Sequence, residues 1–207
     1  MPILTFILEL IGTIAFSVSG ALVAIEKKMD LLGVVILGMM TAVGGGILRD
    51  ITLGQHPPQA LMNPVYILVS LGVSLLVFLP VVRHLIQSKQ HVFDIALLVM
   101  DSIGLGVFTV VGISVAKNVS PDGNLLLQVV VGLVTAVGGG AIRDVLAGQT
   151  PFIFIKHFYA CASLIGALVC AGLWRLLGAT PAMLCGAATV IALRFLAARF
   201  RWELPKS

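Results

Sequence analysis

Long apolar runs, separated by short polar or proline-containing breaks, fill most of the chain. A bilayer-spanning helix needs about 20 apolar residues. Runs of about this length predict seven spanning helices, at residues 3–25, 31–54, 64–84, 93–116, 125–148, 152–176 and 180–200. A lipid-facing barrel strand would alternate apolar and polar positions, and residues 34–37 and 97–100 are apolar throughout. The pattern therefore predicts an all-α membrane protein in which residues 1–207 form a single membrane domain.

The composition supports this interpretation. Hydrophobic residues make up 59% of the 207 positions and charged residues only 11%, whereas soluble domains carry about a quarter charged residues. These values exclude a soluble enzyme, a disordered chain and a coiled coil. The net charge is +4, but no basic face is available for a nucleic-acid backbone. Cys161, Cys170 and Cys185 all fall inside predicted spans, where we expect them to act as small packing residues.

The chain also contains an internal repeat. Residues 41–50 (TAVGGGILRD) return as residues 135–144 (TAVGGGAIRD), and the match, extended to Pro57 and Pro151, gives 11 identities in 17 positions. In the part of each copy that precedes this motif, matching positions are 92 residues apart, which pairs Glu9 with Asp101. We therefore predict two copies of a three-helix unit, at residues 3–84 and 93–176, followed by an extra helix at 180–200. Because three is odd, the second copy is inverted in the membrane, which is typical of transport proteins.

Lysines and arginines in the loops predict the orientation. The side that holds the C-terminus carries eight of them: Lys27, Lys28, Arg83, Lys89, Lys156, Arg199, Arg201 and Lys206. The other side carries only Lys117 and Arg175. We expect a multi-pass protein of the cell (inner) membrane, with the N-terminus outside and the C-terminus in the cytoplasm. No Lys or Arg precedes the first run, so we interpret it as a span and not as a cleaved signal peptide.

Each copy of the repeat has three consecutive glycines inside an apolar span. They are Gly44, Gly45 and Gly46 in the first copy and Gly138, Gly139 and Gly140 in the second. Each glycine weakens a helix by about 1 kcal/mol relative to alanine, and close packing needs only small residues four positions apart. We therefore predict a kink or break in spans 2 and 5. The negative end of the first half-helix would then favour a cation at the middle of the membrane.

An Arg-Asp pair follows each glycine triplet. A charge inside a span normally faces a cavity or a partner, and adjacent helical residues point about 100° apart, so we expect the two members of a pair to face different ways. Depth in the membrane predicts two clusters: Glu9 with Arg49 and Asp50, and Asp101 with Arg143 and Asp144. We interpret them as pathway or gating charges. The alternative is a set of static salt bridges that hold helices together.

With seven spans arranged as three, three and one, and with the duplicated Gly-Gly-Gly-x-x-Arg-Asp motif, the chain resembles the trimeric intracellular cation (TRIC) channel family, in its bacterial and archaeal branch. The resemblance covers about residues 5–200. It implies a homotrimer in membrane lipid, with one pore in each protomer, lined by spans 2 and 5 and conducting K⁺ and also Na⁺. It implies no cofactor and no structural metal. The Lys-Glu-Val signature of animal members is absent.

Two other function classes are compatible with a chain that spans the membrane several times. Similar bacterial proteins are labelled glycine transporters, and an inverted repeat also suits a secondary transporter of a small amino acid such as glycine. A membrane enzyme would need a nucleophile with a base, or a metal cluster. The four histidines, His56, His84, His91 and His157, lie at span edges or in loops without metal-ligand spacing. We therefore predict a channel, with the transporter as the alternative, and no enzymatic activity.

Overall fold

The computed structural model of the chain describes residues 3–88, 90–121, 124–155 and 158–202. Every regular element within these ranges is a helix. The helices are α1 (Ile3–Glu26), α2 (Leu31–Thr52), α3 (Gln59–Met62), α4 (Pro64–Phe78), α5 (Pro80–Ser88), α6 (Gln90–Val119), α7 (Leu125–Leu146), α8 (Phe152–Ile155), α9 (Tyr159–Leu177) and α10 (Ala179–Phe200). Six of the described helices are long and apolar enough to cross a membrane, and α4 is a shorter apolar helix of 15 residues. The predicted all-α membrane class is therefore confirmed.

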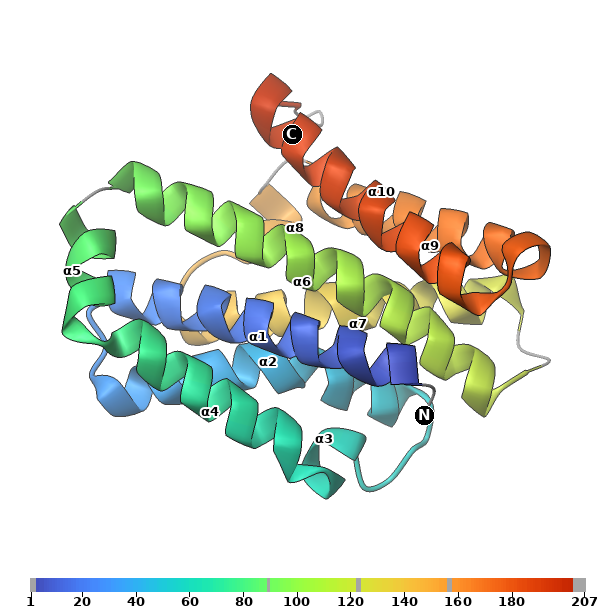
Figure 1. Cartoon of the computed structure of the whole chain (residues 1–207), viewed down its shortest axis with the longest axis horizontal. Helices are drawn as coiled ribbons and strands as arrows, with labels where there is room; N and C mark the ends of the chain where they lie inside the picture. Colours follow the sequence, from blue (N-terminus) through green and yellow to red (C-terminus); the bar gives the residue numbers. More distant parts are fainter. Residues whose placement is uncertain (1–2, 89, 122–123, 156–157, 203–207) are drawn as a thin grey trace.

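The helices form two groups of three with the same internal contacts (Figure 1). Helices α1, α2 and α4 pack against one another, and α6, α7 and α9 do the same. The groups meet where α1 lies against α6 and α2 lies against α7. Helix α10 packs on α6 and α9, outside this pairwise correspondence.

Helices α2 and α7 begin and end in the same way. The side chain of Asp30 accepts a hydrogen bond from the Gly33 amide at 2.7 Å, and Asn124 accepts one from Leu127 at 2.8 Å. Such N-caps satisfy amides that have no partner within the helix. Gly54 and Gly148 adopt positive φ angles of 69° and 67° just after the two C-termini. The chain reversals that follow bring the next segments back over the last turns of α2 and α7.

The structure moves several predicted boundaries. The third predicted span, at 64–84, is divided at Leu79 into α4 and α5. Pro80 has no amide hydrogen and disfavours a helical conformation at the residue before it, and Leu79 is accordingly extended, with ψ of 140°. The sixth span begins at Tyr159 instead of 152, because Phe158 adopts a left-handed conformation. Lys89, Lys156, His157 and Lys206 lie outside the described residues.

Of the predicted kink or break in spans 2 and 5, the break is absent, since both glycine triplets lie within uninterrupted helices, and the kink stays a prediction. The glycines let α2 and α7 cross in backbone contact. A Cβ atom on Gly45 would collide with the carbonyl oxygen of Thr135, and one on Gly139 would collide with that of Thr41. Because residue 41 meets 139 while 45 meets 135, the two helices run antiparallel. Their amides keep their helical partners, so the close approach needs no unpaired backbone group.

Candidate functional site

The first cluster of buried charges lies where α1, α2, α3 and α4 meet. Arg49 Nη1 donates to Glu9 Oε1 at 2.8 Å, and its Nε donates to Asp50 Oδ1, also at 2.8 Å. The second Asp50 oxygen accepts from the backbone amide of Gln59 at 2.8 Å. The Tyr66 hydroxyl donates to Glu9 Oε2 at 2.5 Å. Both carboxylates are thus paired on both oxygens, which a buried charge requires.

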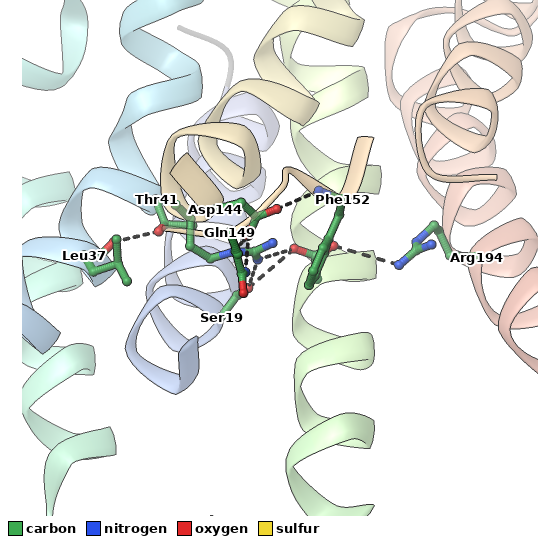
Figure 2. A network of polar contacts seen from close by, with 9 residues as sticks. Ser19, Leu37, Thr41, Asp144, Gln149, Phe152 and Arg194 are labelled. Carbon is green, nitrogen blue, oxygen red and sulfur yellow. Dashed lines mark hydrogen bonds and ion pairs between the residues drawn. The ribbon is translucent and has the colours of Figure 1, made fainter. Parts of the chain in front are cut away.

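The second cluster repeats this geometry with residues of α6 and α7. Arg143 donates to Asp101 Oδ1 at 2.6 Å and to Asp144 Oδ1 at 2.8 Å. The second Asp144 oxygen accepts from the amide of Phe152 at 2.8 Å. Gln149 donates to Asp144 Oδ1 at 3.0 Å. Figure 2 shows Asp144 beside Gln149 and the contact between Asp144 and the backbone of Phe152.

Each Arg-Asp pair is bonded internally, which corrects the expectation that its two members face different ways. Their Cα–Cβ vectors diverge by about 100°. The long Arg side chain nevertheless bends back, so that Nε reaches the neighbouring carboxylate while Nη1 reaches a carboxylate on another helix. The fork-shaped guanidinium suits this double role. The sequence-derived groupings of Glu9 with Arg49 and Asp50, and of Asp101 with Arg143 and Asp144, are found together in space.

Two members of the second cluster were missed by the sequence reasoning. Ser19 of α1 accepts a hydrogen bond from Arg143 and donates one to Asp101 at 3.4 Å. Arg194 of α10 is only 4% exposed, and its Nη2 lies 3.9 Å from Asp101 Oδ2 (Figure 2). Arg194 could have been found from the sequence, because it is a charged residue inside the apolar run at 182–198.

The tyrosines Tyr66 and Tyr159 were also missed, although they stand at matching positions of the two copies, 93 residues apart. Tyr66 binds Glu9, whereas the guanidinium of Arg194 lies 4.8 Å from the centre of the Tyr159 ring. The hydroxyl of Tyr159 is buried and interacts with Asp101, but it makes no contact with full hydrogen-bond geometry within the described part of the chain. The two clusters are therefore similar but not equivalent.

A small cavity adjoins the first cluster. The space that the centre of a water molecule can occupy in it is about 20 Å³. Its lining includes Glu9, Gly46, Arg49, Tyr66 and Phe108. One water needs about 10–15 Å³ by this measure, so the cavity has room for about one water molecule. A Cβ on Gly46 would find its nearest neighbour, an Arg49 nitrogen, at 3.9 Å. The third glycine of the triplet thus borders the cavity, while the second serves the helix crossing.

The other residues singled out in the sequence are placed as follows. Cys170 is buried in an apolar cluster, Cys161 is partly buried and Cys185 is exposed, all as free thiols. Among the described residues, no group of three or more His, Cys, Asp or Glu side chains is arranged to hold a metal ion. The chemistry that the structure concentrates in the membrane interior is therefore that of paired charges.

Comparison with known proteins places this arrangement in a family. A family model described as "Glycine transporter" matches residues 6–81 and 98–175. The UPF0126 inner membrane protein YadS of Escherichia coli K12 is 35% identical over 204 residues, which is 98% of this chain and 95% of YadS.

Two solved structures are similar along nearly the whole chain. A crystal structure of a prokaryotic TRIC channel in 0.5 M KCl gives a TM-score of 0.89 at 31% identity, covering 99% of this chain and 100% of that one. The TRIC trimeric intracellular cation channel orthologue from Rhodobacter sphaeroides gives 0.87 at 34% identity, covering 96% and 98%. The chain belongs to the TRIC family of membrane proteins, in its bacterial branch, whose sequence model carries the glycine-transporter description.

Proposed function

We propose that the protein is a channel for monovalent cations, K⁺ and also Na⁺, with a pathway in each protomer along α2 and α7. The observation that carries this proposal is the placement of the two charge clusters. Arg49 follows Gly45 by four residues, and Arg143 follows Gly139 by four, on antiparallel helices. The arginines therefore stand on opposite sides of the crossing.

A cation that follows this path meets a carboxylate on each side of the crossing. The fixed positive charge of each arginine, which would repel a cation, is offset by the two carboxylates bonded to it. At the crossing itself the backbones touch, so α2 and α7 must separate there for an ion to pass. On this proposal Gly44, Gly45, Gly46, Gly138, Gly139 and Gly140 line the constriction, and Glu9, Arg49, Asp50, Asp101, Arg143 and Asp144 are the pathway or gating charges.

The proposed assembly is a homotrimer in the inner membrane, in line with the description of the Rhodobacter protein as trimeric and of YadS as an inner membrane protein. We assign seven spans, with α4 continued by α5 as the third. Residues 3–84 and 93–176 are inverted copies, which the two separate blocks of the family-model match support. The N-terminus is outside and the C-terminus cytoplasmic. Membrane lipid and permeant ions are the partners, with no nucleic acid, cofactor or catalytic activity.

Purified protein in a planar bilayer tests this function. A KCl gradient should give discrete currents that reverse near the K⁺ equilibrium potential, and replacing K⁺ with Na⁺ should preserve a cation-selective current. A matched preparation of heat-denatured protein controls for detergent leaks. Currents that reverse at the Cl⁻ potential would contradict the proposal, as would silent bilayers from protein shown to be folded.

The description of the family model favours glycine transport as a second candidate. Glu9 and Arg49 border a small cavity and carry the two kinds of charge that a zwitterion would need, although the cavity would have to widen to admit glycine. Saturable uptake of labelled glycine into proteoliposomes, combined with silent bilayers, would favour this function over the channel.

A further inference from the structure

The two charge clusters differ in formal charge. The first contains Glu9, Asp50 and Arg49, which sum to −1. The second contains Asp101, Asp144 and Arg143, which also sum to −1, but Arg194 of α10 adds a positive charge and brings this cluster to zero. Within the described residues, no second arginine or lysine is paired with Glu9 or Asp50.

The acidic residues at the matching positions of the two clusters, Glu9 and Asp101, differ in length by one methylene group. Glu9 is long enough to reach both Arg49 and Tyr66. Asp101, its counterpart, is shorter, and its Oδ2 makes no hydrogen bond within the described part of the chain. The guanidinium of Arg194 lies 3.9 Å from this oxygen and 4.8 Å from the centre of the Tyr159 ring. Helix α10, which lies outside the two three-helix groups, thus supplies a cation to one cluster only.

We propose that Arg194 makes the channel rectify, by removing the net negative charge from the second cluster while the first cluster keeps its own. This inference rests on the proposed channel function. A negatively charged entrance concentrates cations, so cations entering from the side of Glu9 carry more current than cations entering from the side of Asp101. One unit charge about 10 Å from an ion in water changes the local cation concentration about twofold.

Four channels with different charge pairs test this assignment. The wild type has −1 at the first cluster and 0 at the second, R194Q has −1 and −1, E9Q has 0 and 0, and the double variant E9Q/R194Q has 0 and −1. Currents are recorded at equal positive and negative voltages in symmetrical KCl. The recordings use excised patches of a host-cell membrane, in which all copies share one orientation.

We expect the wild type to pass about twofold more current in one direction at low salt. R194Q and E9Q should both bring the current ratio close to one, with a higher conductance in R194Q and a lower one in E9Q. The double variant should reverse the preferred direction. The ratios should approach one at 1 M KCl, where the screening length falls to about 3 Å.

Three further variants separate charge from folding. R194K keeps the charge and should keep the rectification. R199Q removes an exposed arginine from the same helix and should leave the ratio unchanged. Methionine has a similar volume without charge, so R194M replaces R194Q if the glutamine variant does not fold.

The outcomes separate the two proposals. Wild-type currents with the same rectification in R194Q, R194M and E9Q would overturn the role of Arg194 and leave the channel standing. The absence of cation currents in the wild type would overturn the channel itself.

Discussion

At the scale of residues, the membrane interior allows a charge only where partners surround it. In the first cluster, Arg49 has a carboxylate on two of its nitrogens, and each carboxylate uses its second oxygen for another donor. These contacts join α1, α2 and α4 through side chains that lipid could not solvate. Removing one partner leaves a buried charge without compensation, which costs more than the pair itself contributes.

The two tyrosines give a matched test of this principle. We expect Tyr66→Phe to destabilise the protein by about 1.5–3 kcal/mol, since it removes a hydrogen bond to a buried charge. Tyr159→Phe should have a clearly smaller effect, because the Tyr159 hydroxyl makes no contact with full hydrogen-bond geometry within the described chain. Thermal unfolding of both variants in detergent measures the difference. Equal losses of stability would contradict the contrast between the clusters.

Much of this site could be predicted from sequence, because a charge in an apolar span needs a partner. That rule, combined with the repeat, predicted that Glu9 pairs with Arg49 and that Asp101 pairs with Arg143. Arg194 was missed because it has no counterpart in the other copy. Tyr66 and Tyr159 were missed because a tyrosine in a span carries no charge to draw attention. The internal bonding of each Arg-Asp pair depends on side-chain rotamers, which helical periodicity does not specify.

At the scale of elements, the glycine triplets show why a helix-breaking residue need not break a helix. Both helices continue through their triplets, so tertiary contact outweighs the propensity penalty of about 1 kcal/mol for each glycine. Only the structure could separate the roles of the three positions. Gly45 and Gly139 meet a facing carbonyl group, whereas Gly46 meets nothing closer than 3.9 Å. The division of the third span at Pro80, by contrast, could have been read from the proline.

Alanine substitutions separate these roles experimentally. Gly45→Ala and Gly139→Ala should each force α2 and α7 apart and lower the unfolding temperature, since backbone cannot yield as a side chain tip does. Gly46→Ala is the control on the same helix, and its stability should stay the same or rise slightly. Circular dichroism melts in one detergent measure all three. A loss in Gly46→Ala equal to that in Gly45→Ala would contradict the assignment of the close contact to Gly45.

At the scale of the whole molecule, α2 and α7 cross antiparallel, as the proposed inverted arrangement requires. The charge distribution over the loops predicts which side faces the cytoplasm. Lys28, in the turn between α1 and α2, and Asn118, near the end of α6, are exposed on opposite sides in the proposed topology. Each offers a position at which sidedness can be measured.

Single cysteines test the orientation in a background without Cys161, Cys170 and Cys185. On intact cells, a membrane-impermeant maleimide should label Asn118→Cys and should label Lys28→Cys only after permeabilisation. Labelling after permeabilisation controls for exposure of both positions. The reverse pattern would place the N-terminus in the cytoplasm.

The backbone contact between α2 and α7 also limits how the molecule can move. With Gly45 and Gly139 each seated under a carbonyl group of the other helix, sliding one helix along the other would drive main-chain atoms into main-chain atoms. The contact therefore resists sliding and leaves separation of the two helices as the motion that can open a path. On the proposed channel function, opening then has to break the closest backbone contact between the two halves of the chain.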